Sequence, residues 1–405
     1  MKLAVLIPEY PGQTHIFFWR ELGAMRELGA LPEVVSTRRP NAALVSHSWA
    51  REAMASTTYL APPSAGDLLA MGREAARRGP RGLASVAGSV ARATGVDSKG
   101  RLRLLGLAAM GAKLASLARE RGWEHVHAHS CADAAHVAMF AHLLSGLPYS
   151  ITLHGPLQDY GPNQPEKWRH AKFAIVITRK LLGEVETQLR GSLPGRVEIA
   201  PMGVDVQKFV RRGPYAAWDG RGPLRLFSCG RLNPCKGHGD AIAAVGLLRA
   251  RGIDARLEIA GEDEQGGAGF HRALAADVAA TGYAESVTLL GAVSEERVRA
   301  GLEQAHVFVL ASLAEPLGVA IMEAMALAAP VVATGAGGVP ELVRDGVDGV
   351  LVPPETPSAL ADAIERIARD GALAERLARS ARDRVVAGFD STRSARMLIE
   401  HARSV

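Results

Sequence analysis

Short apolar runs alternate with amphipathic stretches along the chain, which predicts strands separated by helices. In the first half, strands are predicted at Leu3–Ile7, Val34–Ser36, His125–His129, Tyr149–Leu153, Phe173–Thr178 and Val197–Pro201. Helices are predicted at Ile16–Leu28, at Ala132–Leu144 and over residues 64–121, with interruptions at Gly79-Pro80 and Gly95. Because strands and helices alternate, we expect a parallel sheet.

The second half shows the same alternation of predicted strands and helices, although its sequence does not repeat that of the first half. Strands are predicted at Leu224–Gly230, Arg256–Gly261, Val287–Gly291, His306–Ser312, Val331–Thr334 and Gly349–Val352. Helices are predicted at Gly237–Arg251, Phe270–Thr281, Ser294–Gln304, Pro316–Ala328 and residues 358–403, the last broken near Gly388-Phe389. The Gly- and Pro-containing stretch Phe209–Pro223 is the predicted linker. We therefore expect an α/β protein of two doubly wound domains, residues 1–209 and 210–388, that face each other across a ligand-binding cleft.

Composition is that of an ordinary globular protein, with 48% apolar and 22% charged residues. The apolar run at the N-terminus is too short for a secretory signal, and no stretch approaches the ~20 apolar residues that span a bilayer. Three cysteines give no disulfide framework. The sequence therefore predicts a protein of the reducing cytoplasm, or one attached to the inner face of the cell membrane.

The net charge of +5 conceals a basic stretch between Arg73 and Arg121, in which Arg and Lys alternate with Leu, Ala, Val and Met. Such a pattern is typical of a helix that lies on an anionic membrane or meets an anionic substrate. A solvated helical face with an apolar underside fits equally well, so both interpretations stay open. Nucleic acid is disfavoured, because aromatic residues make up only 5% of the chain and do not interleave with the basic ones.

A loop with two cations follows the predicted strand Leu224–Gly230. Arg231 and Lys236 lie five positions apart, and such a pair can grip a diphosphate from two sides. Pro316 predicts the start of a helix whose free N-terminal amides form a second anion site. These amides are those of Leu317, Gly318 and Val319. Taken singly, Arg231 and Lys236 are each more often ordinary surface charges.

Two carboxylates accompany this anion site. Glu315 makes sense there if it accepts hydrogen bonds from sugar hydroxyls, and the alternative is a helix N-cap. Glu323 has apolar neighbours, and a carboxylate in a buried helix needs a partner such as a ligand hydroxyl. If both belong to one helix, they lie ~12 Å apart along its axis and suit the two ends of an elongated ligand.

At this point the sequence resembles the donor half of glycosyltransferase family 4, whose signature is E-x7-E. The resemblance is carried by Ser312–Thr334, Gly337–Val343, Asp345–Pro353, Gly230-Arg231, Lys236-Gly237 and Pro201–Asp205. It implies a retaining enzyme with the GT-B fold of two Rossmann-like domains, in which the C-terminal helix at residues 389–405 crosses back to the first domain.

The resemblance also implies the roles of individual residues. Arg231 and Lys236 would bind the donor diphosphate, and Glu323 would bind the ribose hydroxyls. Glu315 and the amides of Leu317–Val319 would hold the donor sugar and its phosphate. Gly291 and Val293 would lie near the base.

In the first half, the loop after the first strand contains Gly12, Gln13 and Thr14, where an exopolysaccharide subgroup of the family has Ser-Glu-Thr. The resemblance implies acceptor contacts there and places His127 and His129 at a strand end by the cleft. Three alternating histidines, of which His125 is the first, share one face of this strand. Zinc is the alternative, but no cysteine or acid lies at a zinc-like spacing.

His154 ends the strand Tyr149–Leu153 and matches the family histidine that contacts the donor sugar. Its alternative is a hydrogen-bonded core histidine. Together with Glu315, Arg231 and Lys236 it completes the predicted catalytic set.

The predicted reaction is a front-face transfer in which the C1–O bond breaks and cations stabilise the leaving diphosphate. The sequence has no Asp-x-Asp, so neither a metal nor a cofactor is expected, and the nucleotide sugar is a co-substrate. A saccharide or lipid-linked saccharide is the expected acceptor. Two alternatives stay open, a nucleotide-sugar 2-epimerase on the same fold and a non-catalytic nucleotide-sugar-binding protein. A dehydrogenase is disfavoured because no G-x-G-x-x-G follows the first strand of either half.

Overall fold

The computed structural model describes residues 1–41, 47–263 and 269–404. They form two compact units, and the described residues of the first are 1–41, 49–201 and 392–404. Those of the second unit are 47–48, 202–263 and 269–391. The chain thus enters the second unit ahead of the predicted linker and leaves it near the C-terminus.

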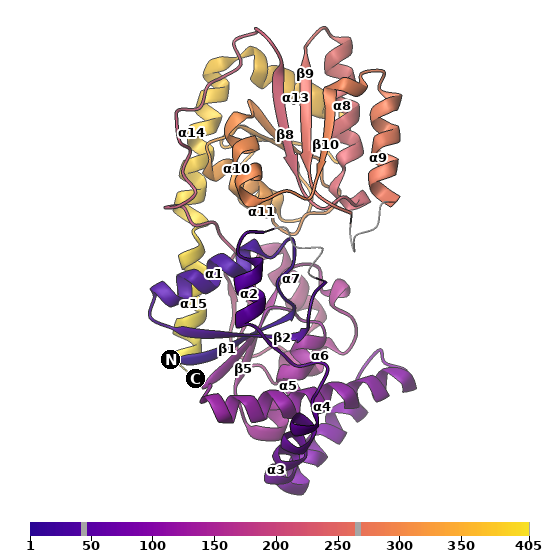
Figure 1. Ribbon diagram of the computed structural model, residues 1–405, viewed down its shortest axis with the longest axis vertical. Helices are drawn as coiled ribbons and strands as arrows, with labels where there is room; N and C mark the ends of the chain where they lie inside the picture. Colours follow the sequence, from indigo (N-terminus) through magenta and orange to yellow (C-terminus); the bar gives the residue numbers. More distant parts are fainter. Residues whose placement is uncertain (42–46, 264–268, 405) are drawn as a thin grey trace. The chain divides into compact units, whose positions relative to one another are not determined.

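The first unit contains a parallel sheet with the strand order β3-β2-β1-β4-β5-β6-β7 (Figure 1). Its strands are β1 (Lys2–Glu9), β2 (Leu31–Arg38), β3 (Thr58–Tyr59), β4 (His125–Ala128), β5 (Tyr149–Leu153), β6 (Ala174–Val176) and β7 (Val197–Ile199). Because β2 and β4 pair with opposite sides of β1, the winding direction reverses between β1 and β4. The loops that follow these two strands therefore diverge at the carboxyl edge, where doubly wound sheets bind ligands.

The helices of this unit are α1 (Ile16–Glu27), α2 (Ala50–Ser56), α3 (Ala65–Arg92), α4 (Ser98–Arg121), α5 (Asp133–Ser145), α6 (Gln164–Arg169), α7 (Arg179–Gln188) and α15 (Ser391–Arg403), with a 3-10 turn at Leu157–Tyr160. The C-terminal helix α15 lies beside α1 (Figure 1), and Leu398 and Ile399 are buried in one apolar cluster with Phe18 and Leu22. The predicted return of the C-terminal helix to the first domain is confirmed.

Both predicted interruptions of residues 64–121 are confirmed. Gly79 adopts a left-handed φ of 63° and kinks α3, and a short connection that includes Gly95 separates α3 from α4. Glycine suits the kink because other residues reach this conformation only with strain.

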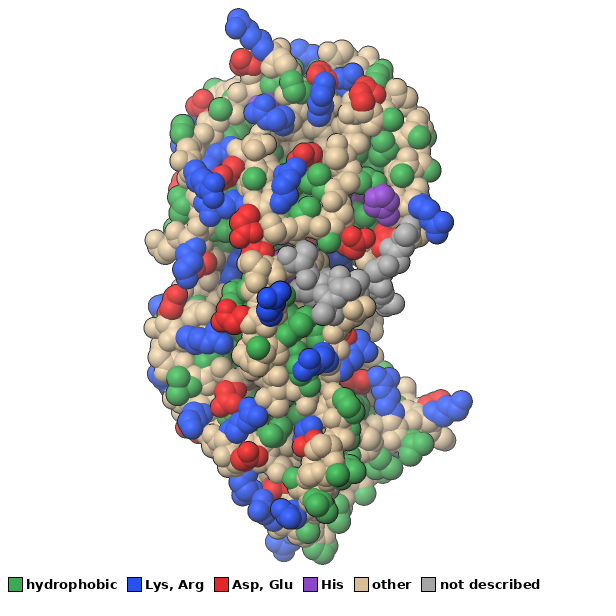
Figure 2. Space-filling model, in the orientation of Figure 1, with side chains coloured by type: hydrophobic (Ala, Val, Ile, Leu, Met, Phe, Trp, Pro, Cys, Tyr) green, Lys and Arg blue, Asp and Glu red, His purple; other side chains and the backbone are tan. Residues whose placement is uncertain are grey.

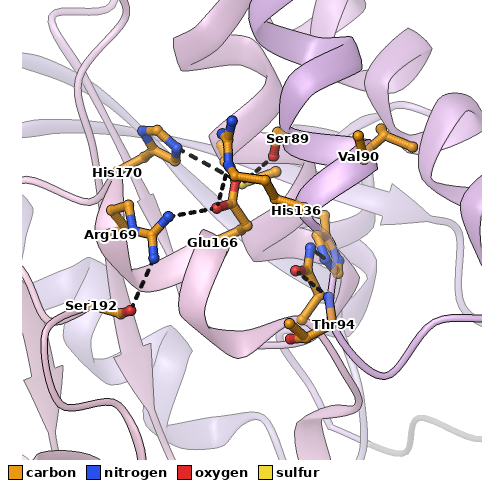
Figure 3. Close-up of polar contacts among 12 residues, drawn as sticks. Ser89, Val90, Thr94, His136, Glu166, Arg169, His170 and Ser192 are labelled. Carbon is orange, nitrogen blue, oxygen red and sulfur yellow. Dashed lines mark hydrogen bonds and ion pairs between the residues drawn. The ribbon is translucent and has the colours of Figure 1, made fainter.

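Many basic side chains of this region pair with carboxylates of the same unit. Glu74 of α3 is 1% exposed and accepts hydrogen bonds from Arg77 and from Arg119 of α4. Glu166 of α6 is a second such centre (Figure 3), bonded to Arg92 of α3 at 3.0 Å and to Arg169 at 2.9 Å. These ion pairs connect α3 to α4 and α6. Several arginines of the basic stretch therefore stabilise the packing of these helices.

The second unit contains a parallel sheet with the order β10-β9-β8-β11-β12-β13 (Figure 1). Its strands are β8 (Leu224–Cys229), β9 (Ala255–Ala260), β10 (Val287–Gly291), β11 (Val307–Leu310), β12 (Val331–Thr334) and β13 (Val350–Val352). Its helices are α8 (His238–Ala250), α9 (Gly269–Ala280), α10 (Glu295–Gln304), α11 (Val319–Ala326), α12 (Val339–Leu342), α13 (Pro357–Arg369) and α14 (Gly371–Gly388), with 3-10 turns at Pro234–Lys236 and Ala284–Ser286. The predicted alternation of strands and helices is confirmed in both units.

The predicted linker Phe209–Pro223 is packed into the second unit. Tyr215 and Trp218 lie against its apolar core, and the Tyr215 hydroxyl donates a hydrogen bond of 2.8 Å to the His306 carbonyl oxygen. The two aromatic rings explain why this segment is not a free connection.

No helix in the three described ranges is long and apolar enough to cross a membrane.

Candidate functional site

The candidate anion site lies at the carboxyl edge of the second sheet. Strand β8 pairs with β9 on one side and with β11 on the other, so the winding direction reverses between β8 and β11. The loop from Gly230 to Gly237 follows β8, and the loop from Ala311 to Gly318 follows β11. Arg231, Lys236 and Glu315 therefore lie on the two loops that diverge at this reversal, as the sequence predicts.

Lys236 and Glu315 join these two loops directly. The Lys236 Nζ lies 2.5 Å from Oε2 of Glu315, and the Ser312 hydroxyl donates to the same oxygen at 3.1 Å. Glu315 is only 7% exposed, and the Lys236 side chain is 14% exposed. A largely desolvated ammonium and carboxylate thus lie in contact at the strand ends.

The backbones of the two loops are in close contact. The Leu313 N–H donates a 2.8 Å hydrogen bond to the Cys235 carbonyl oxygen. Gly237 has a φ of 62°, and a Cβ built there would lie 1.9 Å from the Ala311 carbonyl oxygen. His238 follows and interacts with the Arg231 carbonyl oxygen at 3.3 Å; burial lowers the pKa of this ring to about 4, so it stays neutral. Arg231 and Lys236 are therefore carried on a tightly fixed loop.

The predicted start of the helix after Glu315 is wrong. Helix α11 begins at Val319, and its N-cap is Gly318 with a left-handed φ of 103°. Pro316 and Leu317 precede the helix because the chain turns at Gly318 and cannot be helical there. The first helical hydrogen bond runs from the Met322 N–H to the Gly318 carbonyl oxygen at 3.0 Å.

This correction changes which groups form the helix terminus. The amides that open α11 are those of Gly318, Val319, Ala320 and Ile321, so Gly318 and Val319 of the predicted set are among them and Leu317 is not. Glu315 and Glu323 do not share a helix, and the predicted separation along one axis does not apply.

Glu323 lies on α11 and is 8% exposed. Cys229 lies at the end of β8. Its burial raises the pKa of the thiol to about 12. The charge of Glu323 raises this pKa further, and the charge of Lys236 lowers it. Glu323 therefore lies near the end of β8 together with Lys236. Gly291 ends β10 at the same sheet edge, and its carbonyl oxygen accepts a hydrogen bond of 3.0 Å from the Gly261 N–H; Val293 follows it. The ligand contacts predicted for these residues stay predictions.

The histidines of the first unit form two sets. His125 and His127 both bond the Ser150 hydroxyl at 2.7 Å, and the second nitrogen of His127 lies 2.8 Å from the Thr152 hydroxyl. Burial holds the pKa of His127 well below its usual range. Within the described ranges no group of three or more His, Cys, Asp or Glu is arranged to hold a metal ion. The hydrogen bonds to the Ser150 and Thr152 hydroxyls explain why His125 and His127 can be buried as core histidines.

The second set is His129 and His154, whose Nδ1 and Nε2 atoms lie 3.2 Å apart. The His129 Nε2 also lies 2.8 Å from Glu21, a residue that sequence reasoning missed. The sequence does indicate Glu21, because Phe18, Glu21, Leu22 and Met25 follow the spacing of one helix face, and the other three are buried.

Gly12, Gln13 and Thr14 lie in the loop after β1, with the Gly12 carbonyl accepting a hydrogen bond from the backbone N–H three residues on.

Comparison with known proteins identifies the family. Residues 220–384 match the family model described as Glycosyl transferases group 1. A glycogen synthase of Mycobacterium tuberculosis is 33% identical over 304 residues, which cover 69% of this chain and 69% of that protein. The chain belongs to the group 1 glycosyltransferases. A putative colanic acid biosynthesis glycosyltransferase, WcaL of Salmonella typhimurium, is 30% identical to this glycosyltransferase over 249 residues, covering 60% of the chain and 59% of that protein.

Solved structures identify the fold. Anabaena Alr3699/HepE, solved in complex with UDP and glucose, matches this glycosyltransferase with a TM-score of 0.76 and 19% identity over 100% of both chains. The predicted GT-B fold with two parallel-sheet α/β domains is confirmed.

Proposed function

We propose that this group 1 glycosyltransferase is a retaining, metal-independent member of family 4 that acts in polysaccharide or glycoconjugate biosynthesis. It would transfer a hexosyl unit from a nucleotide sugar, with a UDP-sugar favoured over GDP-mannose, to a saccharide or lipid-linked saccharide. The Lys236–Glu315 pair at the winding reversal of the second sheet carries this proposal. The names of two relatives support it, since HepE was solved with UDP and glucose and WcaL is assigned to colanic acid biosynthesis.

In the proposed reaction, Arg231 and Lys236 bind the donor diphosphate, while Glu323 accepts hydrogen bonds from the ribose. Donor binding draws Lys236 toward phosphate and releases Glu315 to bind hydroxyls of the sugar. The bond between the sugar C1 and the phosphate oxygen breaks, and the negative charge that develops on the diphosphate is stabilised by the two cations and the first amides of α11. The same phosphate oxygen accepts the proton of the acceptor hydroxyl as the new bond forms to C1, on the face that the diphosphate leaves.

The test is incubation of the protein with a panel of UDP-, GDP- and ADP-sugars and a saccharide acceptor, with and without EDTA. We expect one donor to raise the melting temperature, since a ligand that binds only the folded state stabilises it, and to be consumed only when acceptor is present. NMR of the product should give the anomeric configuration of the donor, and EDTA should leave the rate unchanged.

Other outcomes of this experiment identify the alternatives. Donor isomerisation without acceptor would indicate the 2-epimerase. Donor-dependent stabilisation without turnover of any acceptor tested would indicate the binding protein. Loss of transfer in EDTA, restored by Mg²⁺ or Mn²⁺, would contradict metal independence.

We also propose that the first unit contacts an anionic membrane surface through α3 and α4. Leucines of these helices are more than half exposed, namely Leu68, Leu69, Leu83, Leu102 and Leu105. Figure 2 shows hydrophobic side chains gathered over this region with Lys and Arg beside them. Although several arginines are paired, Arg81 and Lys99 form no ion pair among the residues described, and so add positive charge beside the exposed leucines.

Co-sedimentation with vesicles tests this surface. The protein should bind vesicles that contain phosphatidylglycerol and should not bind phosphatidylcholine vesicles. Replacing Leu102 and Leu105 by Ser should weaken binding about 100-fold or more, because insertion of each leucine contributes roughly 1.5 kcal/mol or more. Leu31→Ser, which changes a leucine that is 60% exposed outside these helices, is the matched control. Equal binding by both variants would contradict the proposal.

A further inference from the structure

Three side chains of the first unit form a hydrogen-bonded chain at the carboxyl edge of its sheet. Glu21 is on α1, His129 immediately follows β4, and His154 immediately follows β5. Glu21 Oε2 lies 2.8 Å from Nε2 of His129, and Nδ1 of His129 lies 3.2 Å from Nε2 of His154. Elements far apart in the sequence thus place a carboxylate and two imidazoles in line.

The surroundings of this chain hold it in place. The His129 side chain is 4% exposed and that of Glu21 is 13% exposed. The ring of Phe18 lies 4.7 Å from that of His129 and 5.5 Å from that of His154, and Phe17 also lies 5.5 Å from His154. Aromatic contacts therefore limit rotation of both imidazoles.

The protons in this chain can be assigned from its ends. An ionised Glu21 has only acceptor oxygens, so Nε2 of His129 carries the hydrogen. When this is the only hydrogen on the His129 ring, its Nδ1 is the acceptor, and it requires a hydrogen on Nε2 of His154. The remaining nitrogen of His154, Nδ1, is left as an acceptor.

Two further observations agree with this assignment. Burial alone would raise the pKa of Glu21, but hydrogen bonds from His129 and Ser394 favour the carboxylate, and the pKa is lowered. Burial keeps the pKa of His154 well below its usual range. Glu21 therefore stays ionised and His154 neutral. Within the described ranges, Nδ1 of His154 is buried and has no hydrogen-bond partner. An unsatisfied buried acceptor in a native structure calls for an explanation.

We propose that Glu21 and His129 are positioning residues that hold His154 in its Nε2–H tautomer, so that Nδ1 accepts a hydrogen bond from a hydroxyl of the bound sugar. The use by a sugar rests on the function proposed above, whereas the tautomer is a property of the free protein. Because Nδ1 is buried in this structure, the hydroxyl reaches it when side chains around the ring move aside, and the half-buried Phe17 is one of these neighbours.

The test is two-bond ¹H–¹⁵N NMR of the full-length protein labelled with ¹⁵N-histidine, with the His154 signals assigned by comparison with His154→Asn. In the wild type we expect Nδ1 of His154 to be unprotonated and Nε2 to be protonated. Glu21→Gln keeps the size of the side chain but replaces the charge by an amide that can also donate to Nε2 of His129. This reverses the direction of the chain, so the proton of His154 should move to Nδ1 wholly or in part.

The same variant should reduce kcat for transfer about 10–100-fold, as expected when a residue that orients an active-site histidine is changed, with little change in the KM for the acceptor. Thr152→Val is the matched control: it removes a buried hydrogen bond of the neighbouring His127 and should leave the His154 spectrum and kcat unchanged.

The outcomes separate this inference from the proposed function. A wild-type His154 protonated at Nδ1, or a spectrum that Glu21→Gln does not change, would overturn the tautomer assignment whether or not transfer is detected. The predicted spectra in a protein that transfers no sugar would support the assignment and contradict the proposed function. A reversed tautomer with unchanged kcat would overturn the link to the sugar hydroxyl.

Discussion

Replacing Lys236 by Met is expected to reduce kcat/KM for sugar transfer about 10²–10³-fold, the usual effect of losing one preorganised charge that stabilises a leaving group. Its Nζ is largely desolvated beside Glu315, so it interacts with a diphosphate more strongly than a surface lysine does. Steady-state kinetics with the donor found in the panel measures the loss. The nucleoside diphosphate product should also stabilise the variant less in thermal melts.

The double variant separates this effect from a loss of folding. Lys236→Met leaves the buried Glu315 without its cation, which should lower the free energy of unfolding by about 1–3 kcal/mol. Adding Glu315→Gln removes the unpaired charge and should recover much of that stability, but it should not recover transfer. Lys208→Met, whose ammonium is exposed and paired with Asp205, is the control for losing a lysine of the same unit. Unchanged transfer by Lys236→Met would contradict the proposed donor site.

The sequence was sufficient for most strands, for the longer helices and for the two loops that carry Lys236 and Glu315, but it did not predict α2, β3, α6, α7 or α12. Apolar runs mark buried parallel strands, and residues placed immediately after such strands must meet at one sheet edge. The start of α11 was predicted wrongly because Pro316 is a common first helical residue, whereas the actual N-cap is Gly318 in a left-handed conformation. Conformation at a glycine depends on what its neighbours contact, which the local pattern does not contain.

Contacts between distant side chains account for the other differences. The basic residues of α3 and α4 looked like one continuous charged face, but Arg92 pairs with Glu166 and Arg119 with Glu74. Glu21 is separated from His129 by more than a hundred positions, and only the pairing of β1 with β4 brings α1 to the end of that strand. Partners of this kind depend on the sheet order, which spacing along the chain does not determine.

Gly237→Ala is expected to lower the free energy of unfolding of the second unit by about 3–5 kcal/mol. A left-handed conformation costs a residue with a Cβ about 1–2 kcal/mol, and the added methyl would also lie 1.9 Å from the Ala311 carbonyl oxygen. That oxygen belongs to backbone directly after β11 and cannot rotate away as a side chain can. The two loops must therefore separate, which strains the Leu313–Cys235 hydrogen bond and displaces Lys236. Urea denaturation measures the stability loss, and weaker binding of the nucleoside diphosphate in thermal melts should accompany it.

Gly252→Ala is the matched control, because Gly252 has a similar φ of 82° in the same unit but no atom within 4 Å of the added Cβ. It should cost only the conformational part, about 1–2 kcal/mol, and leave nucleotide binding unchanged. The difference between the two variants isolates the contact between the β8 and β11 loops. Equal losses would mean that conformation alone requires glycine at position 237, and that the loops can separate without disturbing the site. A larger loss at Gly237 with impaired binding would mean that the close approach of these backbones is what holds the cation of one loop against the carboxylate of the other.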